Sequence, residues 1–277
     1  LYAEDRLLKP QVKRNGQWQD AEWGEALGDA AEALKDVNGA DLGVLVHPAS
    51  SNEEGELLRR LATGLGTPHI DHRLRQLDFA DAATATPFGM PVAEFDKLDA
   101  ALLIGSDPRS EMPLLNHRLR QANRGGGPAA GVANRTRFDI STPKGARLFA
   151  LNPARFGFLQ DLAGETVVAP QSLVDEALVL AAAAVELAGA GTVSAGSSHD
   201  ELREAIGPVQ VTDYAREMVE ALSNASASVV VLGEAAVLHP QASWLRAAAR
   251  FVAAATGAKY AEMPCGANAL GLVSVGV

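Results

Sequence analysis

Apolar and polar residues are arranged along the chain in a repeated strand–turn–helix pattern. Short apolar runs, each followed by small polar residues, lie at 42–46, 100–104, 147–151 and 229–232. Stretches with helical spacing of apolar residues stand between or after them, at 53–64, 114–122 and 240–255. Continuous apolar strands that alternate with helices are typical of a parallel sheet covered on both faces. The pattern therefore predicts a doubly wound α/β fold with a mostly parallel sheet.

The start of the chain predicts a β-hairpin followed by a helix. Asn15-Gly16 lies between two short runs of alternating polar and apolar residues, and this dipeptide favours a tight hairpin turn. Residues 23–37 have the spacing of a helix with one apolar face, formed by Ala26, Leu27, Ala30, Ala31 and Leu34. Farther on, Ser51 and Glu54 stand in the relation of a capping box, which predicts a helix that begins just after Ser51.

A Gly-rich loop at 124–145 separates the second apolar run from the third. A loop of this length without regular structure is usually functional or mobile in a compact domain. It is basic on an otherwise acidic chain, through Arg124, Arg135, Arg137 and Lys144. We interpret it as a solvent-exposed loop of variable sequence. The alternative is a loop that contacts a partner subunit.

Composition narrows the range of partners. Hydrophobic residues make up 47% of the chain and charged residues 21%, as in an ordinary globular protein. The formal net charge of −10 disfavours binding to nucleic acid or anionic lipid, which both attract clustered Lys and Arg. The longest apolar stretch, 173–190, carries Asp175, Glu176 and Glu186 and is read as a soluble helix, not a membrane span.

Cysteine usage excludes two kinds of site. The chain has 1 cysteine, Cys265, so it can form no internal disulfide and cannot by itself hold an iron–sulfur cluster. A reducing compartment is the simplest inference. Because the sequence begins at Leu1 and ends within an apolar run, we expect it to be part of a longer protein.

Gly105-Ser106-Asp107 follows a predicted buried strand and opens a predicted helix. Backbone N–H groups at such a turn can bind a phosphate, but a plain βα turn has the same appearance. Neither a GxGxxG sequence nor a GxxxxGK[ST] sequence is present, so no NAD-type or ATP-type phosphate loop is predicted.

The 6 histidines give little support for a metal site. His69 and His72 are three residues apart, and Asp71 or Asp78 could complete a set of ligands, but no second His or Cys pair is near them. We interpret them as surface or hydrogen-bonded residues. For His47 and His239, which stand near prolines after predicted strands, a role in the turn is expected. No nucleophile elbow, Cys–His couple or catalytic carboxylate pair is evident.

Several segments resemble the molybdopterin-oxidoreductase superfamily. Residues 2–27, with the basic hairpin and Trp23-Gly24-Glu25-Ala26-Leu27, are similar to the entry segment that follows the family's iron–sulfur region. Residues 42–54 resemble its strand and "TNEE" helix start. Residues 104–113, IGSDPRSEMP, resemble its "IGSNPxExxP" loop.

Later segments continue the resemblance and point to one branch of the superfamily. Residues 233–241 and 266–271 are similar to the family's return strand and the small-residue turn after it. Residues 69–76, HIDHRLRQ, resemble the variant found in the G-type subunit, the large peripheral-arm subunit of bacterial NADH:quinone oxidoreductase (respiratory complex I). The resemblance covers nearly the whole sequence except the Gly-rich loop and roughly residues 185–210.

The resemblance implies a plan of two Rossmann-like domains. The first would comprise 1–71 plus 228–277 and be truncated at its C-terminus. The second would comprise 72–227 and contain the Gly-rich loop.

Two positions depart from the pattern of catalytic family members. Such members carry Cys, selenocysteine or Ser as a molybdenum ligand a few residues after the position of Asp71, and counting by Arg75 places that position near Leu77. A leucine has no lone pair to offer a metal. Ser106-Asp107 replaces the family's Ser-Asn, and a carboxylate at this point would repel a pterin pyrophosphate.

Together these features imply a scaffold beside the iron–sulfur clusters of NADH:quinone oxidoreductase. The chain would be part of an enzyme without catalytic residues, metal or cofactor of its own, and Gly105, Ser106 and Asp107 would form a vestigial pterin-phosphate loop. Iron–sulfur clusters are expected upstream of Leu1. The expected partners are other peripheral-arm subunits, without nucleic acid or membrane insertion, at the cytoplasmic face of the bacterial plasma membrane.

Two alternatives remain open. One is a molybdopterin-dependent oxidoreductase such as a formate dehydrogenase, with residues 105–113 binding the pterin phosphate. The other is an α/β module that binds a nucleotide at Gly105 and Gly233.

Overall fold

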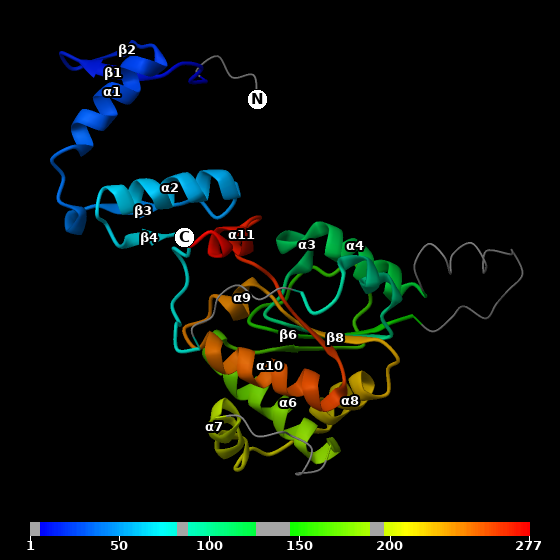
Figure 1. Cartoon of the computed structure of the whole chain (residues 1–277). Coiled ribbons are helices and arrows are strands. Elements are labelled where there is room, and N and C mark those ends of the chain that lie inside the picture. The colour runs from blue at the N-terminus through cyan, green and yellow to red at the C-terminus, as the bar shows by residue number, and fades with distance from the viewer. Residues whose placement is uncertain (1–5, 82–87, 126–144, 189–196) are drawn as a thin grey trace, which may run out of the picture. The chain divides into compact units, whose positions relative to one another are not determined.

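The computed structural model describes residues 6–81, 88–125, 145–188 and 197–277, which form two compact units (Figure 1). Unit 1 comprises Leu1–His72 and Gly271–Val277, and unit 2 comprises Arg73–Leu270. The expected Gly-rich loop lies outside the described residues at 126–144.

Unit 1 begins with the predicted hairpin. Strands β1 (Gln11–Arg14) and β2 (Gln17–Asp20) pair antiparallel, and the turn between them has Asn15 at φ 51° and Gly16 at φ 81°. Two successive residues with positive φ define the turn that matches the twist of a hairpin. Helix α1 (Trp23–Leu34) follows and contains no buried residue.

The rest of unit 1 is a small parallel α/β layer. After the 3-10 turn η1 (Gly39–Asp41), β3 (Gly43–Leu45) pairs parallel with β4 (His69–Asp71), and α2 (Asn52–Gly64) connects them. The capping box at Ser51 and Glu54 is confirmed, because both of its reciprocal hydrogen bonds are present. The core consists of Val46, Leu272 and Val277 with four partly buried neighbours.

Unit 2 is built on a five-stranded sheet in the order β7-β6-β5-β8-β9. All its pairings are parallel. The strands are β5 (Ala100–Ile104), β6 (Arg147–Asn152), β7 (Gly164–Val167), β8 (Ser228–Leu232) and β9 (Lys259–Glu262). Every residue of β5 and β8 is buried, which explains why the two strands are wholly or almost wholly apolar.

Helices cover both faces of this sheet (Figure 1). One core joins alternate sheet side chains to α6 (Leu173–Ala188), α8 (Asp213–Ser223) and α10 (Ala242–Thr256). The core on the opposite face includes η2 (Val92–Lys97) and α4 (Pro113–Asn123). The remaining elements are α3 (Pro108–Glu111), η3 (Pro170–Ser172), α7 (Ser197–Ile206), α9 (Glu234–Val237) and α11 (Ala269–Ser274). The predicted doubly wound α/β class is confirmed.

The division between the units differs from the sequence-based one. We assigned 228–277 to the first domain, but β8 pairs with β5 along its whole length and β9 pairs with β8. Hydrogen bonding across the sheet therefore holds residues 228–263 in unit 2, which extends to Leu270, and only Gly271–Val277 belong to unit 1.

Candidate functional site

The carboxyl ends of β5 and β8 form the place in unit 2 where a ligand would be sought. The chain leaves β5 towards β6 and β7 on one side and returns to β8 and β9 on the other. Ligands of open parallel sheets bind where the strand order reverses in this way. The loops at this point contain Gly105-Ser106-Asp107 and Gly233-Glu234.

Two glycines allow these loops to meet. Gly105 has φ +60°, and a Cβ atom there would lie 2.6 Å from the amide nitrogen of Ala236. A Cβ atom on Gly233 would lie 2.3 Å from the Cα atom of Ser106. Because no side chain fits at either position, the two loops touch through their backbones.

The backbone amides of the loop after β5 all donate to protein acceptors. Gly105 N donates to the carbonyl oxygen of Leu151 at 2.8 Å, and Ser106 N donates to Oδ1 of the buried Asn152 at 2.8 Å. Asp107 N donates to Oε1 of Glu111 at 2.7 Å. The N–H groups that would bind a phosphate are therefore already hydrogen-bonded within the chain.

The Glu111 carboxylate joins the two loops. Besides the Asp107 amide, it accepts from Ser106 Oγ at 3.3 Å and from the Glu234 amide. Burial raises the pKa of Glu111, and the nearby charge of Glu234 raises it further, although the hydrogen bonds act in the opposite direction. With Asp107, whose carboxylate accepts from Ser110 Oγ at 2.6 Å, this end of the sheet is acidic.

Cys265 lies beyond the carboxyl end of β9. Burial raises the pKa of its thiol to about 11, and the charges of Glu234 and Glu262 act in the same direction. The thiol is therefore protonated at neutral pH and is a weak nucleophile.

The Leu77 side chain has no atom that could bind a metal. The Leu77 side chain is 65% exposed and belongs to an irregular segment between β4 and η2. Among the residues that the structure describes, no group of three or more His, Cys, Asp or Glu side chains is placed to hold a metal ion.

Two histidines have roles in turns, as expected. His47 Nδ1 accepts from the amide of Ala49 at 3.1 Å. His239 Nδ1 accepts from the amide of Gln241 at 3.0 Å, and its Nε2 lies 3.0 Å from the carbonyl oxygen of Pro170. Since Nδ1 of His239 is an acceptor, Nε2 carries the proton and donates to that carbonyl.

Sequence reasoning located the loop after β5 but did not predict its internal bonding. Glu111 lies in the family-like segment 104–113, and Asn152 directly follows the apolar run 147–151. Nothing in the sequence shows that their oxygens accept from this loop, because the bonds depend on where β6 and α3 end. Asn152 is fully buried, and its Nδ2 atom has no hydrogen-bond partner among the described residues.

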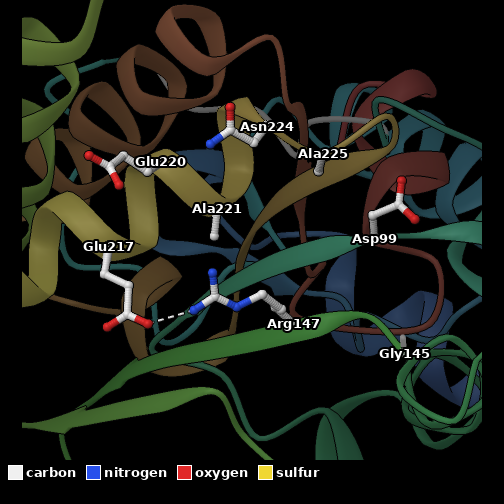
Figure 2. A pocket seen from close by; sticks show the side chains of 8 residues that line it. All are labelled: Asp99, Gly145, Arg147, Glu217, Glu220, Ala221, Asn224 and Ala225. Atoms are coloured by element: carbon white, nitrogen blue, oxygen red, sulfur yellow. Dashed lines mark hydrogen bonds and ion pairs between the residues drawn. The ribbon is translucent and has the colours of Figure 1, made fainter. Parts of the chain in front are cut away.

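A pocket at the opposite end of the sheet was not anticipated (Figure 2). It has a volume of about 330 Å³. Asp99 precedes β5, Arg147 begins β6, and Glu217, Glu220 and Asn224 come from α8 and its C-terminal end. The Arg147 guanidinium forms an ion pair with Glu217 at 2.5 Å and lies over the Phe149 ring. The pocket is acidic, and its one guanidinium is already paired.

No helix in the described parts of the sequence is long and apolar enough to cross a membrane.

Comparison with known proteins gives a consistent set of relatives. The chain is 30% identical over 99% of its length to NADH-quinone oxidoreductase subunit 3 of Thermus thermophilus, but it spans only 32% of that protein. It is 30% identical over 41% of its length to the G-type NADH-quinone oxidoreductase subunit of Rickettsia conorii, covering 17% of it. It is 28% identical over 49% of its length to F420-dependent formate dehydrogenase 2 subunit alpha of Methanococcus maripaludis, covering 21% of it.

A solved structure shows the same fold at lower sequence similarity. The formyltransferase/hydrolase complex of Methylorubrum extorquens contains a polypeptide with a TM-score of 0.55 and 16% identity, matched over 91% of this chain and 59% of that one. The profile of the Molybdopterin oxidoreductase family matches residues 6–270, which is nearly the whole sequence. The chain belongs to the molybdopterin oxidoreductase family.

Proposed function

We propose that this chain is a structural part of the G-type, large peripheral-arm subunit of NADH:quinone oxidoreductase. In this role the chain has no redox centre of its own. It supports the iron–sulfur clusters of the complex, which other parts of the protein would hold. The similarity to subunit 3 over 99% of the chain supports the choice of complex. The location we propose is the cytoplasmic face of the membrane, through contacts with other peripheral subunits.

The hydrogen bonding of the loop after β5 is the observation that carries the proposal. Gly105, Ser106 and Asp107 donate their amides to Leu151, Asn152 and Glu111, so none is directed to an outside phosphate. The carboxylates of Asp107, Glu111 and Glu234 would repel a pyrophosphate at this place. These residues do not fit a pterin dinucleotide, and Leu77 supplies no ligand for molybdenum.

Copurification tests the proposed assembly. The intact subunit, tagged and expressed in its own organism, should be recovered with the membrane-bound complex that oxidises NADH and reduces quinone. Recovery as a free protein, or with a different oxidoreductase, would refute the assignment to this complex.

A molybdopterin-dependent oxidoreductase such as a formate dehydrogenase is the second candidate. The 28% identity to the formate dehydrogenase subunit over 49% of the chain favours it. It requires a metal and a pterin in the purified protein, whereas the scaffold requires neither.

A nucleotide-binding role can be separated from both by thermal denaturation. A nucleotide bound only by the folded chain at Gly105 and Gly233 would raise the melting temperature, and the rise would grow with the logarithm of the nucleotide concentration above its Kd. We expect no change with ATP, GTP or NADH at millimolar concentration.

A further inference from the structure

A short segment of unit 2 exposes three large apolar side chains. Leu74 is 75% exposed, Leu77 65% and Phe79 51%, all within six residues of one another. We call these three side chains the ridge. Single exposed apolar residues are normal on a protein surface, whereas large contiguous apolar patches mark interaction sites.

Hydrogen bonds of the intervening polar residues hold the segment that carries the ridge in place. Asp78, between Leu77 and Phe79, is only 8% exposed. Its Oδ2 accepts from Ser243 N at 2.8 Å and from Ser243 Oγ at 2.6 Å, and its Oδ1 accepts from Ala80 N at 2.9 Å. Gln76 Nε2 donates to the carbonyl oxygen of Asp78 at 3.0 Å. Asp78 therefore ties this segment to α10, while the apolar side chains on either side of Asp78 face solvent.

Two arginines stand beside the ridge, and Asp78, the carboxylate within the ridge segment, is buried. Arg73 and Arg75 alternate with the ridge residues, whereas the chain has a net charge of −10. The Arg75 side chain is 78% exposed, and its guanidinium lies 3.6 Å from Glu234. The Arg73 guanidinium lies over the ring of Phe79 at 5.3 Å. A partner that covers the ridge would gain from carboxylates placed opposite these two arginines.

We propose that the ridge docks into an apolar groove with acidic residues at its rim, on another subunit of the oxidoreductase complex. Leu74, Leu77 and Phe79 would enter the groove, and Arg73 and Arg75 would face the acidic rim. This inference rests on the proposed function. It gives Leu77 a role in assembly, at the position where the family resemblance implies a metal ligand in catalytic members.

The double variant Leu74→Ser/Leu77→Ser tests the ridge in the intact subunit within its own complex. The matched control is Leu114→Ser on α4, whose side chain is 79% exposed and lies outside the ridge. Because the changed side chains are exposed, both variants should fold, with melting temperatures within about 2 °C of the wild type. We expect the amount of the ridge variant recovered with the complex to be at least about tenfold lower than that of the wild type. The control should be recovered like the wild type, and Arg75→Glu should also lower recovery.

Three results would overturn the inference. If the ridge variant assembles like the control, the ridge is not an interface, although the proposed function stands. If the wild type itself fails to copurify with the complex, the proposed function fails and the ridge proposal falls with it. If light scattering shows the isolated protein to be a dimer that Leu74→Ser/Leu77→Ser dissociates, the ridge binds a second copy instead.

Discussion

The reactivity of Cys265 follows from its surroundings. Burial, together with the charges of Glu234 and Glu262, raises the pKa of the thiol to about 11. At pH 8 the thiolate fraction is on the order of 0.1%, well below the fraction for a free cysteine with a pKa near 8.5.

Thiol labelling measures this directly. We expect iodoacetamide to modify folded Cys265 at pH 8 at least about a hundredfold more slowly than the unfolded chain, with a rate that rises up to about pH 11. Labelling as fast as in the denatured protein would contradict the burial and charge that we describe. Since the chain has 1 cysteine, the signal is unambiguous.

Asn152 holds the loop after β5 through a single buried oxygen. Replacing it by alanine leaves the amide of Ser106 without its acceptor at 2.8 Å in a buried place. We expect Asn152→Ala to lower the free energy of unfolding by about 1–3 kcal/mol in urea denaturation. Asn224→Ala, at the exposed end of α8, serves as the control and should stay within about 0.5 kcal/mol. Equal values for the two variants would show that the bond contributes nothing.

At the scale of elements, α10 obtains its N-terminal cap from a distant part of the chain. Its own N-cap residue, Gln241, makes no side-chain cap bond. Asp78 instead accepts from the amide and hydroxyl of Ser243, the second residue of the helix. A negative charge at a helix N-terminus is favourable because the first amides are unpaired and the helix dipole is positive there.

The pKa of Asp78 gives this cap a predictable pH dependence. Burial acts to raise the pKa, but hydrogen bonds from Ser243 and Ala80 and the charge of Arg246 outweigh it, so the folded pKa is lowered. The stabilisation is therefore fully present above the unfolded pKa of about 3.9 and is lost as the pH falls through the lower folded value.

Asp78→Ala should cost about 1–2 kcal/mol at pH 7, measured by urea denaturation. The difference from the wild type should shrink as the pH is lowered from about 5 towards 2. Asp175→Asn, in the first turn of α6, is the control, and because solvent screens this exposed carboxylate we expect its effect to stay within about 0.5 kcal/mol. A difference between wild type and Asp78→Ala that does not change with pH would refute the charged cap.

The contact of the loops after β5 and β8 depends on Gly233. A methyl group there would lie 2.3 Å from Ser106, and both backbones would have to move. We expect Gly233→Ala to destabilise unit 2 by about 3 kcal/mol in the same assay. At Gly207 the nearest atom would be 3.5 Å away, so Gly207→Ala should be tolerated. If both substitutions are tolerated equally, the loops are not in backbone contact.

The sequence predicted the central elements of the sheet better than its edges. β5, β6 and β8 are buried on both faces and read as continuous apolar runs. The edge strands β7 and β9, like β4 in the small sheet of unit 1, have three or four residues with polar ones among them, and the apolar pattern did not identify them. The candidate loop was found because its position depends only on the strand before it. Its bonds to Asn152 and Glu111 could not be predicted from local pattern.

At the scale of the whole molecule, pairing between distant strands limits what sequence can predict. Besides β9, β8 pairs with β5, which is far away along the chain, and no local feature of 228–232 distinguishes this pairing from one with β3. The family resemblance suggested that the chain returns to its first domain near residue 228. The structure places that return at Gly271, because β8 and β9 complete the larger sheet first.

The central claim is that this family member has no pterin cofactor. Three carboxylates, those of Asp107, Glu111 and Glu234, lie where a pterin phosphate would bind, and residue 77 is a leucine. The most direct test is the molybdenum and tungsten content per protein, by ICP-MS, together with pterin fluorescence after oxidation. The protein should be purified from cells that make the cofactor and are supplied with molybdate and tungstate, with a formate dehydrogenase from the same cells as the positive control. We predict less than about 0.05 metal atoms per protein molecule and no pterin, whereas a stoichiometric metal with pterin would contradict the claim.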